Sequence, residues 1–327
     1  MDNLTFFNTA NNQTPIRCKS NEDFKYILLP ICYSLVFIIG LLLNLTALYF
    51  ILFRIRRWKP KTIYMTNLIV CDLMYLFTLP FQVYYYIVKN DWPFFEFFCK
   101  LLRFLFYTNL YGSILFLTCI SVLRFVGICY PMRFMGWVST PRACLVSVII
   151  WTILLVFQAP VLYFSRTNAE RCYDTTTQDL YVYFLIYSSA IMVLFFVVPF
   201  CLVLVCNGMM MRKLSQPSMA GSATSSLRAK KKSIRIIIVV LLVFILCFLP
   251  FHLTRTVHYF FRYFDLPCSV RQYSNVPYKM ARLLVTANGC IDPILYFMSG
   301  EGFQQTIRRK DKQAEQGEEG KRLSTSL

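Results

Sequence analysis

The sequence predicts an all-α membrane protein, built as a bundle of seven transmembrane helices. Hydrophobic residues make up 57% of the 327 positions and charged residues only 15%, whereas soluble domains carry about 25% charged residues. A membrane-spanning helix needs about 20 apolar residues, and stretches of that length recur seven times. They are residues 26–53, 62–88, 97–123, 142–164, 180–210, 233–262 and 272–298.

Residues 1–25, before the first stretch, are polar and lack the apolar core of a signal peptide. We therefore expect them to remain as an extracellular tail. The tail contains glycosylation sequons at Asn3 and Asn12, which make sense only outside the cell.

Basic residues support the same orientation, because they concentrate in segments that it places inside, such as 54–61, 228–235 and 308–322. The formal net charge of +18 then faces the anionic inner leaflet of the lipid bilayer rather than nucleic acid. The sequence predicts a multi-pass plasma-membrane protein with an extracellular N-terminus.

Four of the thirteen cysteines fall in the predicted extracellular segments: Cys18, Cys99, Cys172 and Cys268. An even number of cysteines in an oxidising compartment indicates two disulfides, and the spacing allows three pairings. The sequence contains no CxxC motif or His/Cys cluster that would indicate zinc.

The sixth stretch ends in a cation, Arg255. A charge at that depth costs roughly 2.5–3.5 kcal/mol on insertion scales unless it faces a wet or protein-lined cavity. At helical spacing His252, Arg255 and Tyr259 share one face, whereas Val257 and Phe260 point elsewhere. Pro250 removes a backbone donor from the same helix, which predicts a hinge below the charged end.

Three further cations, Arg103, Lys279 and Arg282, lie near the outer ends of the third and seventh stretches. Four converging cations would repel one another, so an anionic ligand should complete the site. A polyphosphate fits, because arginine binds phosphate oxygens in a bidentate manner and lysine adds a point charge. The alternative is that these side chains reach lipid headgroups or pair with acidic residues of the outer loops.

Aromatic side chains near these cations are suited to the rest of such a ligand. They can stack on a base or a ribose, and the tyrosines also offer hydroxyl groups. Packing in the core is the alternative for each of them and for His252. The aromatic candidates are Tyr107, Tyr111, Phe251 and Tyr259.

A second polar group lies deeper in the predicted bundle and consists of Asp72, Ser113, Asn288 and Asp292. Oxygen ligands of this kind suit a small hard cation such as sodium. Two carboxyl groups that share a proton through water are the alternative.

Motifs spread over all seven stretches keep a fixed order and spacing. They are Asn44, Leu68-x-x-x-Asp72, Cys99, Arg124, Trp151, Pro199, Phe248-x-Pro250 and Asn288-x-x-x-Asp292-Pro293-x-x-Tyr296. In these motifs the chain resembles the rhodopsin-like G-protein-coupled receptors.

Longer strings narrow the resemblance. They include Trp92-Pro93-Phe94, the run from Arg103 to Tyr111, the run from Pro250 to Thr256, and Tyr278-Lys279-x-x-Arg282. Here the chain resembles the metabotropic nucleotide receptors, or purinoceptors, and most closely their branch that responds to uridine and adenosine triphosphates.

The resemblance implies a receptor for extracellular di- or triphosphates of uridine or adenosine, with no enzymatic activity. Binding would activate heterotrimeric G proteins, phospholipase C and calcium release, and arrestin would be a further partner. The ligand would be held by the cations and aromatics named above, and Asp174 would pair with Arg282 in the empty receptor. A sodium ion would occupy the inner polar group, and Arg124, Pro250 and Tyr296 would transmit the signal.

The resemblance also implies two disulfides, Cys99–Cys172 and Cys18–Cys268, and a short amphipathic eighth helix at residues 299–311. The domain organisation is then a tail at 1–25, a seven-helix domain at 26–298, this helix, and a disordered cytoplasmic tail at 312–327. The final residues, 325–327, match a ligand of PDZ domains.

Two positions depart from the pattern of the family. Leu123 and Phe125 flank Arg124 where an aspartate and a tyrosine are usual, and Asn207 stands where a tyrosine usually stabilises the active state. These departures leave basal activity and coupling strength undetermined.

Other classes of protein remain as alternatives. A receptor for an acidic lipid, a leukotriene or a carboxylate would use the same cations. An organic-anion transporter also places charges at membrane depth, but the seven unequal stretches show no internal repeat. An enzyme such as an ectonucleotidase finds no support, because the sequence has two histidines and no catalytic or metal-ligand constellation.

Overall fold

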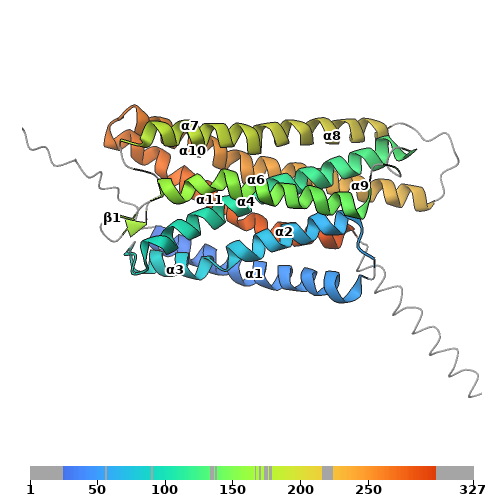
Figure 1. Ribbon diagram of the computed structural model, residues 1–327, viewed down its shortest axis with the longest axis horizontal. Helices are drawn as coiled ribbons and strands as arrows, with labels where there is room; N and C mark the ends of the chain where they lie inside the picture. Colours follow the sequence, from blue (N-terminus) through green and yellow to red (C-terminus); the bar gives the residue numbers. More distant parts are fainter. Residues whose placement is uncertain are drawn as a thin grey trace, which may run out of the picture.

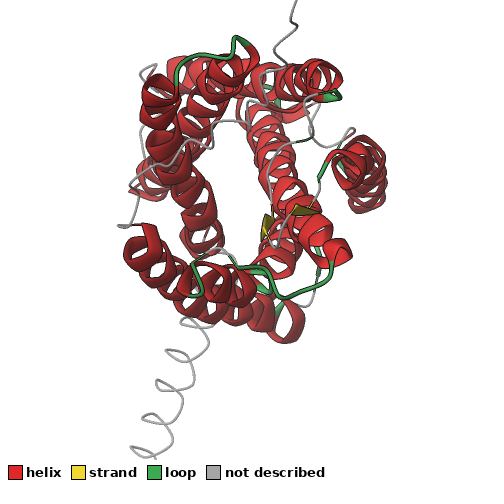
Figure 2. Cartoon of the chain, turned by 90° about the vertical axis from the view of Figure 1, so that its left-hand side faces the viewer, coloured by secondary structure: helices red, strands yellow, loops and turns green. Residues whose placement is uncertain are grey.

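The computed structural model describes residues 25–55, 57–89, 91–132, 136, 138–165, 167–168, 171–172, 176, 179–215 and 224–299. Its helices run side by side along the molecule (Figure 1) and form a ring when seen from one end (Figure 2). The α-helices are α1 (Lys25–Arg54), α2 (Pro60–Leu76), α3 (Leu79–Ile87), α4 (Glu96–Cys129), α6 (Thr140–Phe164), α7 (Tyr181–Met192), α8 (Val198–Ser215), α9 (Thr224–Val243), α10 (Leu249–Tyr263) and α11 (Cys268–Ser299).

These elements make seven rods over the described ranges. Single helices form four of them, α1, α4, α6 and α11. The second rod consists of α2 and α3. The fifth joins α7 to α8 through a π-helical segment, η1 (Val193–Val197), and the sixth joins α9 to α10 through another, η2 (Phe244–Phe248). The predicted all-α bundle of seven helices is confirmed.

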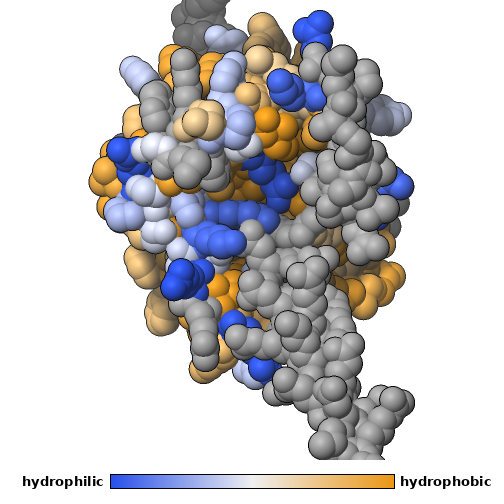
Figure 3. Space-filling view, turned by 90° about the vertical axis from the view of Figure 1, so that its right-hand side faces the viewer, coloured by the Kyte–Doolittle hydropathy of each residue, from blue (hydrophilic) through white to orange (hydrophobic). Residues whose placement is uncertain are grey.

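Six of the seven rods are long and apolar enough to cross a membrane. The exception is α11, which is 32 residues long but carries Lys279, Arg282, Asn288 and Asp292. Apolar side chains on the outside of the bundle, such as Leu42 and Ile186, are exposed, as expected of a surface that contacts lipid. Figure 3 shows hydrophilic side chains gathered on the end of the bundle opposite to β1.

Prolines coincide with the breaks in the rods. Pro80 lies in the first turn of α3, where its missing N–H leaves no helical bond unmade. The segment η2 directly precedes Pro250, and η1 directly precedes Pro199. Extra residues inserted into a helix in this way disturb its regular hydrogen bonds. The irregularity expected near Pro250 is therefore π-helical, and the one before Pro199 was not predicted.

A short hairpin of β1 (Thr167–Asn168) and β2 (Arg171–Cys172) closes one end of the bundle (Figure 1). Cys172 is bonded to Cys99, in the first turn of α4, with 5.7 Å between the two Cα atoms. The disulfide implied by the family resemblance is thus present.

Several predictions fall outside the described residues. They concern Cys18, and with it the Cys18–Cys268 disulfide, Asn3, Asn12, Asp174, the eighth helix beyond Ser299, and the tail at 312–327.

Candidate functional site

The sixth rod presents the face that the sequence predicts. The buried residues of α10 are Phe251, His252, Arg255 and Tyr259. Val257 and Phe260 are each 45% exposed. Arg255 is therefore directed into the bundle, on the helix that starts at Pro250.

Arg255 is only 5% exposed and is held by uncharged groups. Its Nη1 donates a hydrogen bond of 2.9 Å to the Tyr111 hydroxyl on α4, and its Nη2 donates one of 2.6 Å to the Ser188 hydroxyl on α7. The guanidinium carbon lies 4.8 Å from the ring centre of Tyr107 and 5.3 Å from that of Tyr259. Hydroxyls and aromatic faces thus stabilise the cation.

Arg103 and Arg282 are buried in the same part of the bundle, on α4 and α11. The Nη2 of Arg103 donates a hydrogen bond of 3.3 Å to the carbonyl of Cys172, and the guanidinium of Arg282 lies 4.3 Å from the ring centre of Phe106. The two arginines are close enough to repel each other, and both act electrostatically on Tyr107, as Arg255 does. Three of the four predicted cations therefore surround Tyr107.

Lys279, the fourth predicted cation, is half-buried and lies one turn before Arg282 on α11. The interaction expected between Asp174 and Arg282 falls outside the described residues.

The predicted aromatic contacts divide into two groups. Phe251 and His252 are almost completely buried, and the His252 ring stacks on Phe196 with 4.1 Å between ring centres. Their surroundings favour the packing interpretation. Tyr107 and Tyr111 stack on each other at 6.3 Å and both contact Arg255. The tyrosines are therefore better placed to meet a ligand of the arginines.

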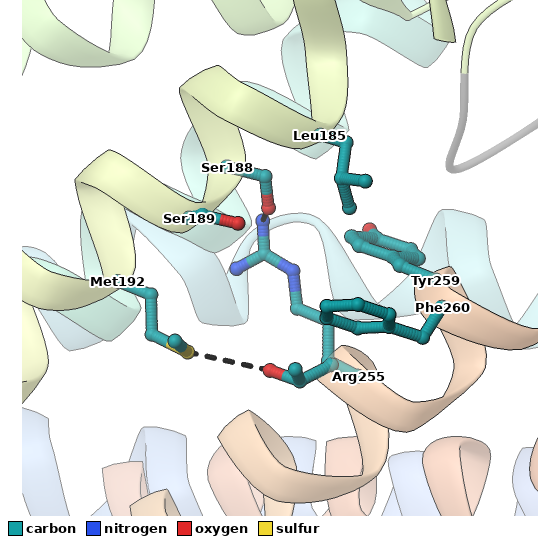
Figure 4. A pocket seen from close by; sticks show the side chains of 8 residues that line it. Leu185, Ser188, Ser189, Met192, Arg255, Tyr259 and Phe260 are labelled. Atoms are coloured by element: carbon teal, nitrogen blue, oxygen red, sulfur yellow. Dashed lines mark hydrogen bonds between the residues drawn. The ribbon is translucent and has the colours of Figure 1, made fainter. Parts of the chain in front are cut away.

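Ser188 was missed by the sequence analysis. It lies within an apolar, aromatic stretch, where a single serine gives no signal of its function. Figure 4 shows its hydroxyl facing the guanidinium of Arg255 across a crevice between α7 and α10. The crevice encloses about 260 Å³, and Met192 and Phe260 also line it. Arg255 lines a second recess as well, which lies among α4, α6 and α7.

The predicted inner polar group also comes together. Asn109 donates a hydrogen bond of 2.9 Å from Nδ2 to Asp72 Oδ1, and Asn288 donates one of 2.7 Å from Nδ2 to Asp292 Oδ2. Ser113 is completely buried and close enough to Asp292 to act on its carboxyl. Asn109 was missed, although its spacing of four residues from Ser113 puts both on one helix face.

Helix packing explains why the two carboxyls meet. A Cβ atom at Gly289 would lie 3.5 Å from Asp72 Oδ1, so α2 approaches the backbone of α11 closely there. Asn44 reinforces this contact by donating a hydrogen bond of 2.7 Å to the Gly289 carbonyl. Asp72 Oδ2 and Asp292 Oδ1 are buried and accept no hydrogen bond from the described residues. Free carboxyl oxygens beside a hydroxyl fit a small hard cation.

The predicted transmission residues lie on three different rods. Arg124 is half-buried near the end of α4, and Tyr296 is buried on α11. Asn207, which departs from the family pattern, is buried on α8. Pro250, by contrast, lies close to the ligand side of the bundle, one turn before Arg255.

A seven-helix bundle with a disulfide-bound hairpin at one end and buried polar groups inside defines a membrane receptor. Residues 43–296 match the model of the seven-transmembrane receptors of the rhodopsin family, and the chain belongs to this family. Within it the chain belongs to the metabotropic purinoceptors, as the identities to its relatives show. The resemblance to nucleotide receptors is confirmed, as is the expectation of a receptor rather than an enzyme.

The chain is 49% identical over 289 residues to metabotropic purinoceptor 2 of Homo sapiens, an alignment that covers 87% of this chain and 76% of the relative. It is 43% identical over 304 residues to metabotropic purinoceptor 4 of Homo sapiens, with 92% and 82% covered. Identity to metabotropic purinoceptor 1 of Bos taurus is 37% over 333 residues, with 99% and 88% covered.

Proposed function

We propose that this receptor binds extracellular di- or triphosphates of uridine or adenosine and activates heterotrimeric G proteins. The relatives named purinoceptors support this ligand class. The observation that carries it is the gathering of Arg103, Arg255 and Arg282 around Tyr107. Buried cations that repel one another are stabilised most strongly by a ligand with several negative charges.

In this proposal the phosphates bind the three guanidinium groups, and Lys279 contributes from the next turn of α11. The ligand then connects α4, α10 and α11, because each of these helices supplies a cation. Arg255 exchanges its uncharged partners on α4 and α7 for phosphate oxygens. Such differential contacts are what a ligand needs to shift a conformational equilibrium.

The favoured conformer is one in which the inner part of the sixth rod moves outward. Arg255 lies above Pro250, and η2 lies just below it, so an irregular joint separates the ligand side from the inner end of the rod. Arg124 would then meet the G protein, with phospholipase C and calcium release as the output. A sodium ion among Asp72, Ser113, Asn288 and Asp292 would stabilise the inactive conformer.

We place the receptor in the plasma membrane with its N-terminus outside. Arrestin is proposed to bind the active receptor from the inside, and a PDZ protein to bind residues 325–327. These partners rest on the family resemblance and on the last residues of the sequence.

The test uses cells without endogenous nucleotide receptors that express this chain at the surface. We expect calcium release in response to at least one of the triphosphates or diphosphates of uridine and adenosine, and no response to a leukotriene or to lysophosphatidate. Arg103→Ala should lower nucleotide potency, while Lys100→Ala, whose ammonium pairs with Glu96 on the same helix, should not. A response to the lipids alone would transfer the receptor to another class of anionic ligand.

A further inference from the structure

The recess among α4, α6 and α7 opens beside Arg255 and is lined largely by aromatic side chains. Tyr107 and Tyr111 from α4, Tyr187 from α7 and Gln158 from α6 line it together with Arg255. It encloses about 310 Å³, and little of that space is wide enough for a water molecule. A recess of this form suits a flat group that enters between rings as the side chains move apart.

Gln158 gives the recess a specific polar group. Its side chain is 1% exposed, and its Nε2 donates no hydrogen bond within the described parts of the chain. A buried donor without a partner is unfavourable. Asn67, another amide inside the bundle, donates hydrogen bonds to the Ile63 carbonyl and the Ser147 hydroxyl. The contrast indicates that the partner of Gln158 arrives with a ligand.

We propose that this recess holds the nucleobase of the agonist and that Gln158 hydrogen bonds to the edge of the base. The inference rests on the proposed function. A primary amide carries a donor and an acceptor side by side, so it complements the N3–H and O4 of uracil as well as the amino group and ring nitrogen of adenine. The tyrosine rings add stacking surface.

The position of Arg255 connects the base to the phosphates. Arg255 lines the recess and also contacts Tyr107, around which Arg103 and Arg282 gather. Arg103 and Arg282 themselves are not among the lining residues. A nucleotide therefore places its phosphates on the three arginines and its base in the recess, with Arg255 at the junction.

The test replaces the amide with a group of similar shape, Gln158→Met, and compares three agonists: uridine triphosphate, its 3-methyl derivative, and ribose 5-triphosphate, which has no base. The variant should lower the potency of uridine triphosphate about tenfold and leave that of ribose 5-triphosphate unchanged. The methyl group blocks the N3–H, so the derivative should be weak at the wild type and lose little more at the variant. Thr152→Val, on the lipid side of the same helix, is the matched control.

The outcomes separate the two proposals. Equal losses for uridine triphosphate and ribose 5-triphosphate would show that Gln158 only supports the fold, and would overturn the base site. Additive effects of the methyl group and of Gln158→Met would also overturn it, since a direct contact makes them non-additive. This cycle decides even if ribose 5-triphosphate is too weak to measure. A wild-type receptor that ignores all three compounds and the adenosine nucleotides refutes the proposed function instead.

Discussion

The guanidinium of Arg255 on α10 and the hydroxyl of Ser188 on α7 are joined by a hydrogen bond of 2.6 Å. Together with the bond to Tyr111 on α4, it makes Arg255 a link among three helices while keeping its charge unneutralised by these partners. An arriving phosphate therefore competes with two hydroxyls rather than with a carboxylate. Neutral partners are exchanged more readily than charged ones, because charge-assisted hydrogen bonds are stronger.

Arg255→Lys keeps the charge but replaces the planar fork with one ammonium, which cannot reach Tyr111 and Ser188 in the same geometry. We expect it to lower nucleotide potency about tenfold, and Arg255→Ala to lower it about a hundredfold. Calcium concentration–response curves at matched surface expression measure both. Equal potencies for the lysine variant and the wild type would show that a point charge suffices. Lys100→Ala serves as the control for loss of an exterior cation.

Arg282→Glu should abolish the nucleotide response while surface expression persists, because it places a carboxylate where the phosphates are expected. Arg282→Gln should retain a weaker response, since it removes the charge without reversing it. The comparison requires surface labelling and calcium release in the same cells. A receptor of unchanged potency after charge reversal would exclude Arg282 from the phosphate site.

The disulfide between Cys99 and Cys172 also positions a ligand residue, because Arg103 hydrogen bonds to the Cys172 carbonyl. Loss of a native disulfide typically destabilises a small secreted domain by about 2–5 kcal/mol. We expect Cys99→Ser, Cys172→Ser and the double variant to show the same loss of surface expression and potency. Losses that add up in the double variant would mean that the two cysteines act separately.

The helix α4 packs very closely on α2 at Gly112, where a Cβ atom would lie 2.8 Å from Cys71 Sγ. Gly112→Ala should lower the stability of the solubilised receptor by about 1–3 kcal/mol, as overpacking does. Adding Cys71→Ala should restore most of it, because the next atom, Cys71 Cβ, is 3.7 Å from that position. Thermal inactivation in detergent measures this, and a double variant no better than Gly112→Ala would contradict the packing argument.

If sodium binds between Asp72 and Asp292, replacing it with choline in the medium should raise agonist potency at the wild type. Asp72→Asn should remove this sensitivity to sodium. Asp91→Asn changes an exposed acid in the loop before α4 and should retain it. Wild-type potency that ignores sodium would favour two carboxyls that share a proton.

Periodicity and composition predicted the spans and the inward face of α10 well, because both follow from how side chains partition between lipid and the bundle interior. The same reasoning missed Ser188 and Gln158. Each is a single polar residue on a largely apolar helix, and only the packing of α4, α6, α7 and α10 shows what they face. The π-helical segment before Pro199 was also missed, since proline marks a break in a helix but not the form of that break.

The polar character of α11 has a consequence for biosynthesis. Lys279, Arg282 and Asp292 oppose its transfer into lipid as an isolated helix. The completed bundle surrounds these same groups, since α11 packs against α1 and α10. The last helix therefore enters the bilayer with the help of helices already inserted, and variants that loosen α1 or α10 would be retained during assembly rather than fail at the cell surface.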